Sequence, residues 1–143
     1  MLKDLKQNLV DLLTSDTMLT ALLASSGAVY HHRPRKPAEF PCLTYFVIER
    51  ADPGSDGPDR SVVELHLDIW SASADTNDSI LAALDALLFY PDCGGELDSD
   101  GFRVGTCGRV YAATPDSDVR DTSGSDIQRM ETIWRMTLLK AGI

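Results

Sequence analysis

The residues best suited to chemistry are the histidines and the carboxylates near them. His66 and Asp68 lie two positions apart in an alternating segment, so both side chains should project from one face of a strand. His31 or His32 could join them, because imidazole with carboxylate is a sensible ligand set for zinc. The same pair also suits the solvated face of an amphipathic strand. The sequence favours this plainer interpretation over a metal site or a hydrolase that uses His66 and Asp68.

The sequence contains none of the common catalytic motifs. It has no G-x-G-x-x-G or Walker-type loop, no G-x-S-x-G elbow and no H-E-x-x-H pair. Gly94 and Gly95 follow a helical pattern and precede acidic residues, which is the reverse of an anion-binding helix start. The cysteines show no C-x-x-C spacing; they are Cys42, Cys93 and Cys107. We expect free thiols, no metal, no cofactor and no enzymatic activity.

Length and charge limit the remaining classes. The 143 residues suit a single domain over positions 1–143. The 13 basic and 22 acidic residues give a net charge of −9, so the chain is a poor candidate for gripping DNA. No apolar run approaches the roughly 20 residues that cross a bilayer. The N-terminus lacks the apolar stretch of a signal peptide, which predicts synthesis in the cytoplasm and no membrane partner.

Three segments of the sequence have the apolar spacing of helices. Residues 2–13 carry a leucine stripe, and a second short helix should begin at Ser15 or Asp16 and stop at Gly27. The predicted apolar residues of this second helix are Met18, Leu19, Leu22 and Leu23. A third helix follows the capping residues at 73–78 and places its leucines at helical spacing before Pro91.

Strand patterns occupy much of the remainder. Residues 43–50 are rich in β-branched and aromatic types, and 62–70 alternate strictly, with Val63, Leu65, Leu67 and Ile69 on one face. Further strands are expected at 102–113, where Gly105 and Gly108 suggest a bulge or a close backbone approach, and at about 127–140. The predicted fold class is α+β, with an antiparallel or mixed four-stranded sheet and helices on one face, in the order α-α-β-β-α-β-β.

A basic cluster lies in the proline-containing connector after His32. We expect Arg33, Arg35 and Lys36 to contact an acidic surface, and the chain supplies acidic loops of its own. A head-to-tail contact between this cluster and the acidic loops of the next copy would close into a ring where the rotation permits. A solvated loop is the plain alternative.

The order of these elements is familiar. A short capped segment leads to Gly27-Ala28-Val29-Tyr30 and the connector, which ends in Phe40-Pro41-Cys42-Leu43-Thr44-Tyr45. A strand closing on Leu67-Asp68-Ile69-Trp70-Ser71-Ala72 runs directly into an alanine-rich helix. From about residue 5 to the final strand, this pattern resembles the tail-completion or tail-terminator proteins of long-tailed phages, the group related to the terminator of phage lambda. The His31-His32 pair and the long acidic loop at 114–126 depart from the family pattern.

The resemblance implies a structural subunit that forms a hexameric ring, stops growth of the tail tube and offers the surface to which the head joins. The implied partners are other copies of the chain, the tail-tube protein and the head–tail connector protein. The implied location is the host cytoplasm during assembly and then the virion tail. Alternatives are another head–tail joining or minor tail protein, or a small non-enzymatic bacterial binding or regulatory domain.

DNA would pass through such a ring without specific binding, because an acidic channel repels phosphate. We expect some carboxylates of the acidic loops to face this channel; the candidates are Asp52, Asp56, Asp59, Asp116, Asp118 and Asp121.

Overall fold

The computed structural model of the chain describes residues 2–34, 39–50, 60–89, 94–99, 101–116 and 119–140. In chain order the elements are α1 (Leu2–Ser15), α2 (Thr17–Thr20), β1 (Val29–His31), β2 (Cys42–Arg50), β3 (Arg60–Ser71), α3 (Ala74–Leu87), α4 (Gly94–Leu97), β4 (Phe102–Ala113) and β5 (Gln128–Lys140). Both predicted helix starts have side-chain caps: Asp16 accepts from the backbone N–H of Leu19, and Ser73 from that of Thr76.

The strands form one five-stranded sheet in the order β1-β2-β3-β5-β4. Pairing is antiparallel except between β1 and β2, which run parallel. The longest ladder joins β3 to β5, from Arg60 opposite Leu139 to Ser71 opposite Gln128. The sheet is therefore mixed, which was one of the two predicted forms.

The prediction of four strands was wrong, because β1 adds a fifth. This strand has only three residues, so it shows no alternation, and it pairs with β2 across the connector. The element order is α-α-β-β-β-α-α-β-β, with the four-residue helix α4 inside a segment that we expected to be an acidic loop. Leu97 anchors α4 because its side chain is fully buried, a signal too short to show as periodicity.

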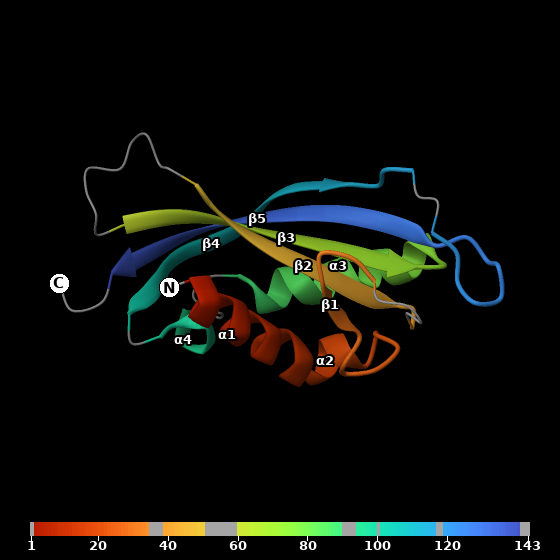
Figure 1. Ribbon diagram of the computed structural model, residues 1–143, viewed down its shortest axis with the longest axis horizontal. Coiled ribbons are helices and arrows are strands. Elements are labelled where there is room, and N and C mark those ends of the chain that lie inside the picture. Colours follow the sequence, from red (N-terminus) through yellow and green to blue (C-terminus); the bar gives the residue numbers. More distant parts are fainter. Residues whose placement is uncertain are drawn as a thin grey trace.

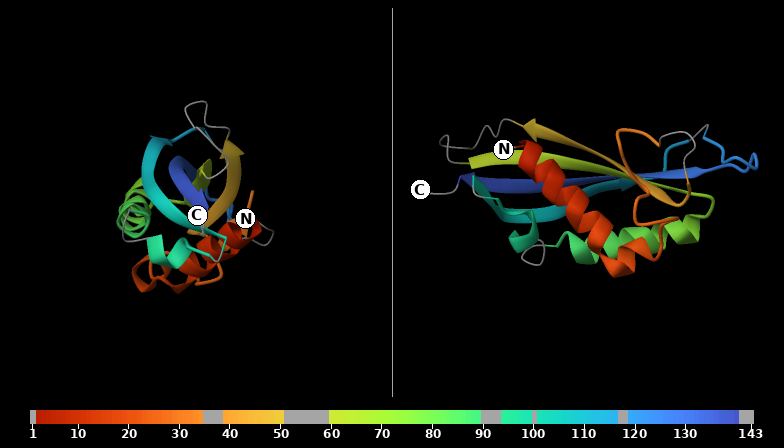
Figure 2. Two further views of the ribbon diagram at one scale, coloured as in Figure 1. Left: turned by 90° about the vertical axis from the view of Figure 1, so that its left-hand side faces the viewer. Right: turned by 60° about the horizontal axis from the view of Figure 1, so that its bottom comes forward.

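The helices lie on one side of the sheet, as predicted (Figures 1 and 2). We call this side the covered face and the other the open face. On the covered face, β3 buries the alternating residues predicted for it; these are Val63, Leu65, Leu67 and Ile69. The leucine stripe of α1 and residues Ile80 and Leu84 of α3 join the same core. Figure 2 (left) shows that the sheet is strongly curved, with β2 and β4 standing on either side of β3 and β5.

One local expectation was wrong and another was confirmed. Met18 was assigned to the buried side of the second helix, but its side chain is 77% exposed, because α2 ends at Thr20 and only Leu19 of this helix is buried. The bulge at Gly105 is confirmed by a register shift between Val104 and Thr106. A second shift lies between Arg109 and Tyr111, whereas Gly108 itself stays in register.

Candidate functional site

The open face carries a row of side chains that crosses the sheet. Phe46, His66, Ile133 and Tyr111 occupy matching register positions on β2, β3, β5 and β4. The Phe46 and His66 rings stack with centroids 4.4 Å apart, and the His32 ring stacks on Phe46 at 5.2 Å. We call these five residues the cross-sheet row. Stacking contacts of this kind fix ring orientation, so the row presents a defined surface.

His32 reaches the row through an uncommon backbone conformation. Its φ of 68° lies in the left-handed region, which costs a residue with a side chain about 1 kcal/mol. The His32 N–H donates to the carbonyl oxygen of Tyr45 at 2.9 Å, and this bond holds the turn against β2. The turn places the exposed Arg33 beside the open face.

A charged cluster borders the row on one side. Glu64 accepts a hydrogen bond from Arg50 at 3.0 Å and lies 3.6 Å from the guanidinium of Arg135. His66 Nε2 lies 3.5 Å from the same carboxylate and is buried without a hydrogen-bond partner among the described residues. Burial of Glu64 would raise its pKa, but Arg50 and His66 outweigh this and hold the pKa below its usual value. Glu64 is therefore ionised at neutral pH.

A second cluster borders the row on the other side. Arg129 makes a 2.8 Å contact with Asp68 and donates to Glu131 at 2.8 Å, while its guanidinium lies 5.4 Å from the ring centre of Trp70. Burial raises the pKa of Asp68, and the charge of Arg129 opposes that rise. Trp70 donates to Thr44 at 2.9 Å. Each buried polar group of this cluster therefore has a partner on the same face.

His66 and Asp68, the candidates for a metal or hydrolase site, are both engaged in contacts with neighbouring side chains. The two side chains share a face, as the alternation predicted, but Asp68 is held by Arg129, and His66 lies between Phe46 and Glu64. Within the described part of the chain, no three metal-binding side chains cluster. The open face is thus organised as a surface of paired charges and stacked rings.

The predicted contact residues are only partly within the described residues. Arg33 is exposed; Arg35 and Lys36 lie outside the described residues, as do Asp52, Asp56, Asp59 and Asp118. Asp116 is exposed, and Asp121 is partly exposed in the loop between β4 and β5.

The carboxylate of Asp121 organises its own loop. It accepts from the backbone N–H groups of Ser123 and Ser125, both at 2.9 Å, and from the Ser123 hydroxyl at 2.7 Å. These hydrogen bonds, that of the Ser123 hydroxyl first, lower the pKa of Asp121. Gly124, with a φ of 86°, closes the turn. Asp121 therefore has a structural role whatever surface it faces.

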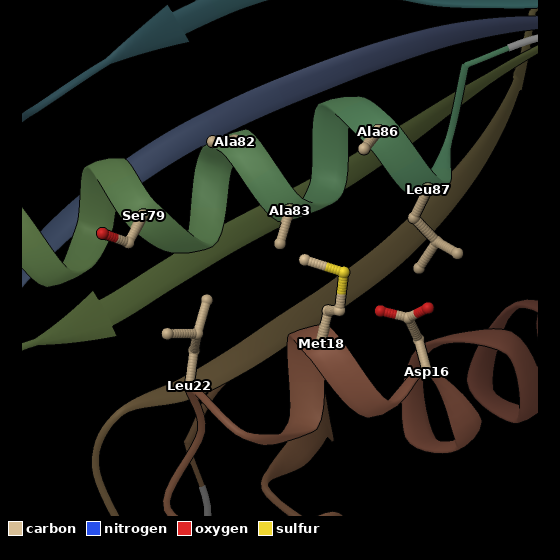
Figure 3. Close-up of a pocket in the computed structure, with 8 residues that line it drawn as sticks. All are labelled: Asp16, Met18, Leu22, Ser79, Ala82, Ala83, Ala86 and Leu87. Carbon is tan, nitrogen blue, oxygen red and sulfur yellow. The ribbon is translucent and has the colours of Figure 1, made fainter.

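An apolar groove lies on the other side of the molecule, between α2 and α3 (Figure 3). Its volume is about 380 Å³, and the lining residues are Asp16, Met18, Leu22, Ser79, Ala82, Ala83, Ala86 and Leu87. Small side chains on α3 keep the floor open, and Met18 reaches across it from α2. Sequence reasoning missed this groove because the alanines were interpreted only as helix formers.

The cross-sheet row was also missed. Alternation indicates which face a residue occupies, but which residues are neighbours across strands depends on register. The signals in the sequence were His66 and the His31-His32 pair next to the proline-containing connector, and they identified two members of the row, His32 and His66.

The fold matches that of a known particle component. A chain from the solved structure "Virion of native gene transfer agent (GTA) particle" aligns with a TM-score of 0.67 and 20% identity, covering 90% of each chain. Comparison with curated proteins gives no match. In the described residues, no helix is long and apolar enough to span a membrane.

The fold is thus one found in a phage-like particle. Residues 7–124 match the family model described as "Tail completion protein gp17". This chain belongs to the tail completion protein gp17 family. The resemblance inferred from the element order is thereby confirmed at the level of the family.

Proposed function

We propose that this chain is a non-enzymatic structural subunit that forms a ring at the end of a tail tube. The ring terminates tube growth and provides the surface to which the head joins. The observation that carries this proposal is the family match over residues 7–124, since a tail completion protein acts at the end of tail assembly. The fold shared with a chain of a gene transfer agent virion supports it.

The proposed partners are further copies of the chain, the tail-tube protein and the head–tail connector protein. Arg33, with Arg35 and Lys36, contacts an acidic surface of the neighbouring copy in this proposal. The position of Arg33 supports this contact, because it is exposed beside His32 at the border of the open face.

The proposed ring has an acidic channel, lined by carboxylates of the acidic loops. Asp116 and Asp121 lie beyond Ala113 and before Gln128, at one end of the long strands. Asp52, Asp56 and Asp59 lie outside the described residues; in sequence they fall between Arg50, the last residue of β2, and Arg60, the first of β3. In this proposal the carboxylates of both loops line the channel, and DNA passes without specific binding.

The test is to delete the gene for this chain in a strain that produces the phage-like particles, and to examine the particles that assemble. We expect tails of irregular, excessive length that carry no heads, seen by electron microscopy, and rescue when the chain is supplied in trans. Tails of normal length joined to heads would refute the proposed function. Tails of normal length without heads would retain the joining role and remove the terminating role.

A further inference from the structure

The open face is basic relative to the rest of the chain. Although the net charge is −9, the arginines of the described open-face strands outnumber the carboxylates. The arginines are Arg50, Arg60, Arg103, Arg129 and Arg135; the carboxylates are Glu64, Asp68 and Glu131. Arg50 and Arg135 are more than half exposed, whereas Glu64 is only 12% exposed, so the positive groups are the ones that project.

The helix layer has the opposite charge. Among its described residues, the acids of the helices and their flanks are Asp4, Asp11, Asp16, Asp75, Asp78, Asp85, Glu96 and Asp98. Only Lys3 and Lys6 on α1 oppose them within the helices, and Arg109 of β4 binds Asp85 at 2.9 Å. The molecule thus has one basic side and one acidic side, back to back.

Apolar groups accompany both charged sides. On β4, at the edge of the sheet, Val110 is 50% exposed and Tyr111 is 44% exposed. On the helix side, the groove between α2 and α3 is lined by alanines and by the exposed Met18. The edge exposes large apolar side chains, and the groove exposes an apolar lining, so the two surfaces match in apolar character.

We propose that the open face of one copy docks on the helix layer of a second copy, with the Val110–Tyr111 edge entering the α2–α3 groove. The two surfaces lie on opposite sides of the sheet, so the contact joins unlike patches and leaves the helix layer free on one copy and the open face free on the other. Such a contact continues from copy to copy and closes into a ring when the rotation permits. The inference rests on the proposed function and names the surfaces that would build the ring.

Charge complementarity favours a second copy as the occupant. The acidic side demands a basic partner surface, and the same chain carries one that matches it in apolar character. Electrostatic attraction of this kind sets orientation and excludes like-with-like pairing, since two basic or two acidic sides repel.

Cross-linking between two variants that each carry one introduced cysteine tests the contact. Cys42 and Cys107 are buried, and burial raises the pKa of Cys42 to about 12, so neither competes; Cys93 is replaced by serine in every variant. Val110→Cys protein is mixed with Ser79→Cys protein at high concentration and oxidised. A second mixture uses Ala86→Cys, which lies at the other end of the groove (Figure 3).

We expect mixed disulfide dimers in severalfold excess over both homodimers in at least one mixture. The proposal would be overturned if, in both mixtures, mixed dimers were no more abundant than random collision predicts. A dominant Val110→Cys homodimer would also overturn it. Tail length in the producing strain is read separately. Loss of tail termination on deletion of the chain, with no mixed cross-link, rejects these surfaces and leaves the proposed function intact. A mixed cross-link, with no effect of the deletion on tails, supports the surfaces and rejects the proposed function.

Matched charge reversals sharpen the result. Arg135→Glu on the open face should reduce the mixed cross-link severalfold, because it places an acid against the acidic helix layer. Lys3→Glu changes the net charge equally but lies on the helix layer, where it should leave the cross-link undiminished. Equal loss in both variants would show a mere net-charge effect and count against the docking surfaces. Circular dichroism of each variant checks that it is folded.

Discussion

The two faces of the sheet are stabilised by different interactions. The covered face buries aliphatic side chains and Trp134 against the helices, with residues such as Leu65 and Leu67 fully inaccessible. The open face holds its central residues in place by ion pairs and ring stacking, as between Glu64 and Arg50 or between Phe46 and His66. One face therefore supplies most of the folding free energy, while the other keeps polar groups organised for contact with a partner.

The largest expected effect comes from the covered face. Leu67→Ala should reduce the free energy of unfolding by about 2–5 kcal/mol, because it removes buried methyl groups and leaves a cavity. The matched change Leu139→Ala lies on the open face, where the side chain is only partly buried, and should cost clearly less. Urea unfolding monitored by circular dichroism gives both values. Equal losses would contradict the division of roles between the faces.

Alternation was sufficient to predict the covered face. The strict pattern from Val63 to Ile69 has a period of two, and burying one side of it requires no knowledge of the neighbouring strands. The leucine stripe of α1 was equally explicit. The family also followed from the order of the elements, because the order is a property of the whole chain.

The open face and the groove could not be predicted in the same way. The contact of Asp68 with Arg129 joins residues of β3 and β5 that are far apart in the chain, and only the register brings them together. The fifth strand pairs across the connector, and the exposure of Met18 follows from where α2 ends. Each of these features depends on tertiary placement, which local patterns do not contain.

The second prediction compares two arginines. Arg129→Met should cost about 1–3 kcal/mol, because Asp68 would remain only 8% exposed with its main cation removed. Arg120→Met breaks the ion pair with Asp126, whose partners are 65% and 80% exposed, and should change stability by less than about 1 kcal/mol. Urea unfolding at neutral pH measures both. A larger loss at Arg120 would show that the open-face pair is not structural.

The third prediction compares the two tryptophans, each of which donates to a threonine on its own face. On the covered face, Thr132 accepts from Trp134 at 3.1 Å and donates to the carbonyl oxygen of Leu67, so Thr132→Val leaves two groups without this partner. We expect a loss of about 1–2 kcal/mol. Thr44→Val on the open face removes only the acceptor for Trp70 and should cost about half as much. Unfolding followed by tryptophan fluorescence checks the order, and a reversed order would contradict it.

The smallest expected effect is on the pH dependence of stability, to which two carboxylates contribute with opposite signs. Burial raises the pKa of Asp68 above its ordinary value of 3.8, so the folded state binds more protons there than the unfolded state. Its contribution to stability therefore falls as pH rises from 3.8 through the raised pKa. The pKa of Asp121 is lowered below 3.8 by its loop hydrogen bonds, so its contribution is lost as pH falls from 3.8 through the lowered pKa.

Replacing each carboxylate by its amide isolates these contributions. The stability of Asp68→Asn relative to the wild type should increase with pH, and that of Asp121→Asn should decrease with pH. Urea unfolding at intervals between about pH 2 and pH 6 covers the window in which both groups titrate. The same slope in both variants would contradict the comparison, because it would mean that burial does not raise the pKa of the open-face carboxylate.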